Sequence, residues 1–216
     1  MSRQPQRVYC AGPLFNTKER EEMAQVAKAL EDAGYATFLP QRDGLELMPC
    51  VRALVARGFG ERQAVAMLSK AIFALDIYQV VEDCDAIVVN LNGRVPDEGA
   101  VSEAAIAWCS GKALVGYKAD GRSLFLGQDN PLVAGLFDFS VCDTIDGVIS
   151  AMTSQLAGRV SRAKRTAHRR QQLTSCLSLG KRISGALRSP DRIESVTRVL
   201  TEEKPRITQM PSLAQK

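Results

Sequence analysis

The sequence lacks the motifs that mark several large classes of enzyme. It contains neither G-x-G-x-x-G nor G-x-x-x-x-G-K-[ST], the glycine-rich loops that hold phosphates in dinucleotide-binding and P-loop proteins. Its only histidine, His168, lies in a basic C-terminal segment, which leaves the rest of the chain without histidine-based triads or most zinc chemistry. If the chain is an enzyme, its carboxylates must therefore carry the chemistry.

Signals for membrane insertion and secretion are also missing. No run of about 18 apolar residues is present, so we expect no membrane span. The first 15 residues lack the apolar stretch of a signal peptide. The six cysteines form no C-x-x-C pair, and Cys10 and Cys109 lie in apolar patterns typical of small core residues. These features predict a reduced, cytoplasmic protein without structural zinc.

The net charge of +4 hides an uneven distribution along the chain. Residues 1–150 hold 14 Lys and Arg against 20 Asp and Glu, whereas residues 151–216 hold 14 Lys and Arg against 4 Asp and Glu. This split predicts an acidic compact domain over 1–157 and a basic, partly disordered or helical extension over 158–216. The extension has the charge to contact nucleic-acid phosphates, but a solvated tail explains the same composition.

Apolar periodicity predicts strands that alternate with helices, the pattern of a doubly wound parallel sheet in an α/β fold. The expected strands span residues 7–12, 36–39, 86–91, 112–117 and 139–142. Helices are expected from residue 17 to Gly34, over 61–82, around 101–108, over 132–137 and 145–156, and in the extension at 159–183 and 191–203. Acids in the first turns of the first helix, Glu22 among them, suit its dipole. We expect residues 41–60 to form a loop with one helical turn at most.

The stretch 85–107 brings acids to the point where a buried strand passes into a helix. Ligands of open α/β sheets bind there, outside the carboxyl ends of the strands. Glu103 lies one turn into the helix, Asp97 lies in the turn before it, and Asp76 lies in an apolar setting that would raise its pKa. Each of these positions also has an explanation without function. In that case Glu103 is an acid stabilised by the helix dipole, Asp97 is a helix cap, and Asp76 lies on a solvated face.

Five sequence blocks carry a resemblance to a known family. They are VYCAGPLFN at 8–16, DIYQVVEDCDAIVVNL at 76–91, NGRVPDEGAVSEAAIA at 92–107, GYKADGR at 116–122 and DNPLVAGLF at 129–137. Together, over about residues 7–155, they resemble the nucleoside 2-deoxyribosyltransferase family. The resemblance implies a flavodoxin-like fold, a five-stranded parallel sheet with helices on both faces. It also implies a homo-oligomeric enzyme that moves the deoxyribosyl group of a nucleoside between nucleobases, without a metal or other cofactor.

The resemblance further implies roles for seven residues. Glu103 would attack the anomeric carbon and form a covalent deoxyribosyl-enzyme, oriented by a hydrogen bond from Tyr9. Asp76 would contact the base and assist its protonation, and Asp97 would hold the sugar hydroxyls. The other implied contacts with the nucleoside involve Gly12, which lets the ligand approach the backbone, Phe15, which packs on the nucleoside, and Asn130, which a neighbouring subunit contributes. These roles suit the chemistry, because a carboxylate stabilises oxocarbenium character and a protonated base leaves more readily.

Two alternatives remain open. The first is an N-glycoside hydrolase acting on nucleosides or nucleoside 5'-monophosphates, in which water attacks the intermediate. Related monophosphate hydrolases typically carry serine where this chain has Asp97, whose charge would repel a 5'-phosphate, whereas Arg94 and Arg122 keep this alternative open. The second is a non-catalytic nucleoside- or nucleotide-sensing domain with a nucleic-acid-binding tail. The chain also departs from the family in carrying Ala105 where glycine is usual.

Overall fold

The fold centres on a parallel five-stranded sheet. A computed structural model describes residues 5–122, 129–157 and 162–202. The strands are Arg7–Ala11 (β1), Ala36–Phe38 (β2), Ala86–Asn90 (β3), Ala113–Tyr117 (β4) and Val141–Cys142 (β5). Their order is β2-β1-β3-β4-β5, and each adjacent pair is parallel. This order confirms the predicted doubly wound α/β fold and reverses direction between β1 and β3, where ligands of such sheets bind.

Helices cover both faces of the sheet. One face packs against α1 (Thr17–Asp32) and α7 (Ile145–Ala157), and the other packs against η1 (Gln79–Asp83), α5 (Glu98–Cys109) and α6 (Pro131–Leu136). Successive residues of β1 alternate between these layers, so Cys10 faces α1 whereas Tyr9 faces α5. Cys10 is buried as predicted, but Cys109 is exposed at the end of α5, so the prediction that it lies in the core is wrong.

The prediction of a loop over residues 41–60 is also wrong. Two helices form there, α2 (Pro40–Asp43) and α3 (Leu47–Val55). The helix α2 has no side-chain cap, although the Leu39 backbone N–H just before it donates to Asp43 Oδ2 at 2.8 Å. The helix α3 has no side-chain cap, and its one buried residue, Val51, packs on Ala64 and Leu68 of α4 (Glu61–Tyr78). Its stability therefore comes from a partner that the local sequence does not reveal.

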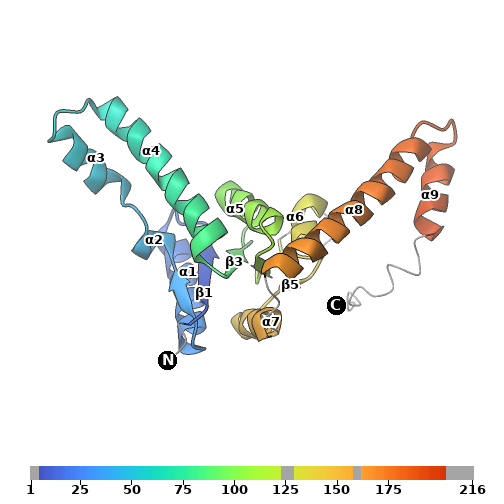
Figure 1. Cartoon of the computed structure of the whole chain (residues 1–216), viewed down its shortest axis with the longest axis horizontal. Coiled ribbons are helices and arrows are strands. Elements are labelled where there is room, and N and C mark those ends of the chain that lie inside the picture. The colour runs from blue at the N-terminus through green and yellow to red at the C-terminus, as the bar shows by residue number, and fades with distance from the viewer. Residues whose placement is uncertain (1–4, 123–128, 158–161, 203–216) are drawn as a thin grey trace.

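Together α3 and α4 form a helical hairpin that projects away from the sheet (Figure 1). The continuous helix Glu61–Asp83, formed by α4 and η1, is long and apolar enough to cross a membrane by length and composition alone, with a mean hydropathy of 1.6. That test is weak evidence, because core helices of soluble proteins also pass it. Here the carboxyl end of the helix enters the domain core through Val80, while Phe73 is 68% exposed on the projecting part.

The C-terminal extension forms a second helical hairpin, α8 (Arg162–Ala186) and α9 (Arg192–Glu202), which projects from the other side of the domain (Figure 1). The first turns of α8 are joined to the domain, since the Arg169 guanidinium lies over the Trp108 ring of α5 at 5.6 Å from its centroid. Helices were predicted here at nearly these positions. The division at residue 157 stays a prediction, and residues 158–161 and 203–216 of the extension lie outside the described residues.

Candidate active site

Tyr9 and Glu103 meet in the layer between the sheet and α5. The Tyr9 hydroxyl donates a hydrogen bond to Glu103 Oε1 at 2.7 Å, which is the contact that the sequence predicted. Tyr9 is fully buried in β1, and its ring stacks on Phe38 with the ring centroids 5.5 Å apart. A rigid strand and a packed ring therefore fix the position of the hydroxyl, and the hydroxyl in turn fixes one oxygen of the carboxylate.

The start of α5 determines where Glu103 lies. Asp97 is the N-cap of this helix, and its Oδ1 accepts a hydrogen bond from the Ala100 backbone N–H at 2.7 Å. Ala100 and Ala104 are buried against the sheet, which turns the face carrying Glu103 toward β1. Ala105, where the family usually has glycine, is only partly buried, and the hydrogen bond between Tyr9 and Glu103 forms in its presence.

Asp76 joins this pair from α4. It lies close to the carboxyl end of that helix and is partly buried. Burial raises the pKa of Asp76, and a hydrogen bond with Tyr9 opposes this rise. Both carboxylates thus converge on the hydroxyl of one tyrosine, although they lie 27 positions apart in the sequence.

The electrostatics of the site favour protonated groups. Burial is the main cause that raises the pKa of Glu103 to about 7, and the negative charges of Asp76 and Asp97 add to it, while the Tyr9 hydrogen bond opposes it. Burial, followed by the charges of Glu103 and Asp76, raises the pKa of Tyr9 well above its usual range, so the phenol remains a hydrogen-bond donor. At neutral pH Glu103 can therefore exist as a carboxylate or a carboxylic acid, which suits covalent and proton-transfer chemistry.

The other three predicted site residues lie outside this cluster. The Phe15 side chain is 79% exposed, and its backbone N–H donates to Glu19 Oε2 at 2.9 Å. Asn130 is exposed and caps α6 by accepting a hydrogen bond from the Leu132 N–H at 2.9 Å. Packing alone explains Gly12, because a Cβ atom there would come within 2.6 Å of Met23 Sδ. The ligand contacts of these residues stay predictions.

Comparison with known proteins identifies the family. A family model described as nucleoside 2-deoxyribosyltransferase matches residues 8–175. The chain belongs to this family. The match runs past residue 155, where we expected the resemblance to end, and includes the first part of α8. No curated protein sequence matches the chain.

Several solved structures are similar to this chain. A conserved protein from Enterococcus faecalis V583 aligns with a TM-score of 0.51 and 17% identity, covering 70% of this chain and 99% of that protein. A 2-desoxiribosyltransferase from Leishmania mexicana aligns with a TM-score of 0.48 and 20% identity, over 69% and 98% of the two chains. A 2-deoxyribosyltransferase from Bacillus psychrosaccharolyticus aligns with a TM-score of 0.40 and 19% identity, over 56% and 77%. The likeness to the Enterococcus faecalis protein concerns the fold alone.

Sequence reasoning missed a polar network beside the site of this deoxyribosyltransferase-family chain. Glu22 of α1 accepts hydrogen bonds from Asn90 Nδ2 at 3.1 Å and from Asn92 Nδ2 at 2.5 Å. Asn92 Oδ1 in turn accepts from the backbone N–H groups of Ala119 and Asp120, at 2.8 and 2.9 Å. The loops that follow β3 and β4 are thereby tied together, and the first of them leads to Asp97. The sequence explained Glu22 by the helix dipole, which hid this role.

A second missed contact holds the segment that leads to Asn130. Lys118 Nζ lies 2.6 Å from Asp129 Oδ1, and both side chains are at most 10% exposed. Lys118 also donates to the Gly93 carbonyl oxygen at 3.1 Å. A buried ion pair that loses one partner leaves an uncompensated charge. The Lys118–Asp129 pair therefore fixes the start of α6 against the loop after β3.

Proposed function

We propose that this chain transfers 2-deoxyribosyl groups between nucleobases through a covalent intermediate on Glu103. The observation that carries the proposal is the hydrogen bond between Tyr9 and the partly buried Glu103, with Asp76 on the same hydroxyl. Family membership supports the reaction class. The geometry supports the assignment of the nucleophile, because a single carboxylate oxygen is held by Tyr9 and the other remains available for attack.

The reaction divides into two displacements at the anomeric carbon. In the first, a carboxylate oxygen of Glu103 forms a bond to C1' as the bond from C1' to the base nitrogen breaks, and the leaving base takes a proton from Asp76. In the second, a nitrogen of an incoming base attacks C1', the ester bond to Glu103 breaks, and the proton of that nitrogen returns to Asp76. The raised pKa of Asp76 suits the protonated acid that the first step needs.

A base-exchange assay tests the proposal. The protein is incubated with thymidine and free adenine, and deoxyadenosine is measured by chromatography. We expect deoxyadenosine from the wild type and none from Glu103→Ala. Mass spectrometry of the wild type with thymidine alone is expected to reveal one deoxyribosyl group on Glu103. Free deoxyribose without any exchange product would instead support the hydrolase, and full activity of Glu103→Ala would refute the mechanism.

We also propose that the chain assembles as a homo-oligomer. The projecting hairpin of α3 and α4 carries apolar side chains that the single chain leaves exposed, including Phe73 at 68% and Tyr78 at 53%. Burial of such residues against another copy is favourable by about 25 cal/mol for each Å² of apolar surface. Light scattering after size exclusion is expected to give more than one chain per particle, and Phe73→Glu is expected to lower this number. A monomeric wild type would contradict the proposal.

A further inference from the structure

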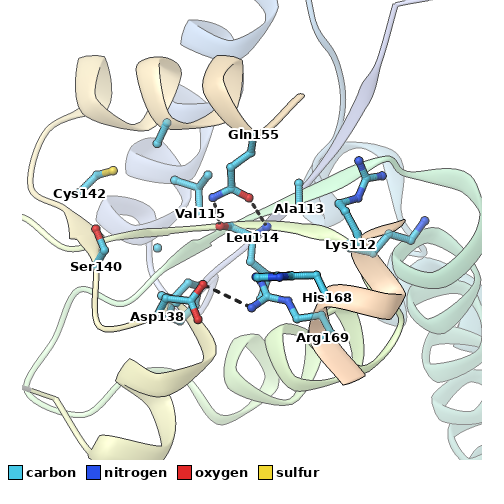
Figure 2. A pocket seen from close by; sticks show the side chains of 14 residues that line it. Lys112, Ala113, Leu114, Val115, Asp138, Ser140, Cys142, Gln155, His168 and Arg169 are labelled. Carbon is cyan, nitrogen blue, oxygen red and sulfur yellow. Dashed lines mark hydrogen bonds and ion pairs between the residues drawn. The ribbon is translucent and has the colours of Figure 1, made fainter. Parts of the chain in front are cut away.

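A cavity lies at the open edge of the sheet, on the side of β4 that faces β5. Its volume is about 480 Å³, within the range of small-molecule sites. It is bounded by β4, α7, the segment 137–142 and the first turns of α8, as Figure 2 shows. We call it the edge cavity. Its lining does not include Tyr9, Asp76 or Glu103, so it is separate from the candidate active site.

The cavity exists because the last strand is too short to cover its neighbour. The two residues of β5 pair only with Gly116 and Tyr117, so among the described residues the earlier part of β4 has β3 on one side and no strand on the other. A side chain of α7 takes the place of that strand: Gln155 Oε1 accepts from the Leu114 N–H at 3.1 Å, and Gln155 Nε2 donates to the Leu114 carbonyl at 2.7 Å (Figure 2). The hydrogen-bonding groups of the Leu114 backbone thus have partners although no strand covers them. The space left beside β4 is closed on its far side by α8.

The charge of the lining is predominantly positive. Lys112, Arg165 and Arg169 line the cavity together with the imidazole of His168, and Asp138 is the one acid in its described lining. Burial lowers the pKa of Arg165, as expected for a cation that has lost water. Arg165 Nε also donates to the Gly111 carbonyl oxygen at 3.1 Å.

Two of these side chains are suited to hold an anion. Arg169 Nη1 donates to Gln172 Oε1 at 2.8 Å and lies 3.4 Å from Asp138 Oδ2, whose carboxylate is 58% exposed and also accepts a hydrogen bond from Gln172 Nε2 at 2.9 Å. The carboxylate would therefore keep a partner if Arg169 turned to a ligand. His168, one residue earlier, makes no hydrogen bond or ion pair with the residues that the structure describes. The remaining walls are largely apolar and include Leu114, Val115 and Phe137.

We propose that the edge cavity binds a small organic anion, whose carboxylate or phosphate group is held by Arg169 and His168. The apolar or aromatic body of this ligand lies against Leu114, Val115 and Phe137. The proposal does not depend on the transferase function, because no catalytic residue lines the cavity.

Isothermal titration calorimetry with four probes tests the chemistry. Phenyl phosphate and benzoate combine an anionic group with an apolar body, whereas inorganic phosphate has only the charge and benzyl alcohol only the body. We expect at least one of the first two to bind about tenfold more tightly than either of the others, and the tighter one identifies the anionic group. If neither binds more tightly than inorganic phosphate, the proposal is wrong.

Four variants locate the binding. Arg169→Gln removes the charge, and Ala151→Leu fills the cavity without changing any charge; each is expected to weaken binding of the tighter probe about tenfold or more. Arg170→Gln, on the same helix but outside the lining, and Glu103→Gln are expected to bind like the wild type. Circular dichroism verifies that each variant is folded. If Glu103→Gln weakens binding whereas Arg169→Gln and Ala151→Leu do not, the anion binds near the catalytic carboxylates and the proposal is wrong.

Discussion

Tyr9→Phe isolates the effect of one hydroxyl on the charge of Glu103. The substitution keeps the ring that stacks on Phe38 and removes the donor that lies 2.7 Å from Glu103 Oε1. A hydrogen bond to a charged group contributes about 1.5–3 kcal/mol, which corresponds to about one to two pKa units. Because this bond stabilises the carboxylate, its loss is expected to move the pKa of Glu103 upward from about 7.

The assay is kcat/KM for base exchange as a function of pH, which reports the pKa of the free enzyme. For the wild type we expect activity to rise through about pH 7 as Glu103 ionises. For Tyr9→Phe the midpoint is expected about one to two units higher, so the rate relative to the wild type falls roughly fivefold to fiftyfold at pH 7, and this deficit narrows in alkaline buffer. Tyr35→Phe, which removes a hydroxyl 3.1 Å from Thr153 Oγ1, is the control and should leave the profile unchanged. A Tyr9→Phe enzyme that loses rate equally at pH 7 and pH 9 would refute the reasoning.

Three further predictions concern stability and charge. Glu103→Gln is expected to be more stable than the wild type at pH 8, by at most about 3 kcal/mol in urea unfolding, and equal to it at pH 4. The sign follows from the raised pKa of Glu103. The protonated acid contributes fully to the free energy of unfolding below about pH 4.5, and this stabilisation is lost as the pH rises through about 7. Asp97→Asn keeps the helix cap but removes a negative charge, so the midpoint of the pH–rate profile should fall below that of the wild type; an unchanged midpoint would contradict it. Gly12→Ala should lose about 1–3 kcal/mol of stability through its clash with Met23, whereas Gly121→Ala, with open space around it, should not.

The sheet was predictable from the sequence for a physical reason. Buried parallel strands read as continuous apolar runs, and the switch from strand to helical periodicity after Asn90 locates the carboxyl end of β3. Once the strand order is known, side chains near the ends of β1 and β3 must lie close together. The assignment of Tyr9 to Glu103 came from the family resemblance, and the 2.7 Å hydrogen bond confirms the contact.

Other parts of the molecule left no readable trace in the sequence. The helix α3 has a single buried residue and no capping side chain, so neither apolar periodicity nor a capping motif predicted it. The bonds from Asn90 and Asn92 to Glu22 join residues about 70 positions apart, and a glutamate near the start of a helix has a sufficient local explanation. The edge cavity arises because β5 is short. The sequence pattern predicted that this strand begins at residue 139, two residues before its observed start.

The burial of Tyr9 has a consequence for anyone who wishes to engineer the pH optimum of this chain. The group that most directly favours the ionised nucleophile is also a core side chain of the central sheet, fully enclosed and stacked on Phe38. Changes of size at that position would disturb packing before they tuned acidity. Asp97 and Asp76 influence the same carboxylate from helices that are partly open to solvent. Directed evolution toward acidic or alkaline operation should therefore enrich substitutions around these two acids and leave the tyrosine unchanged.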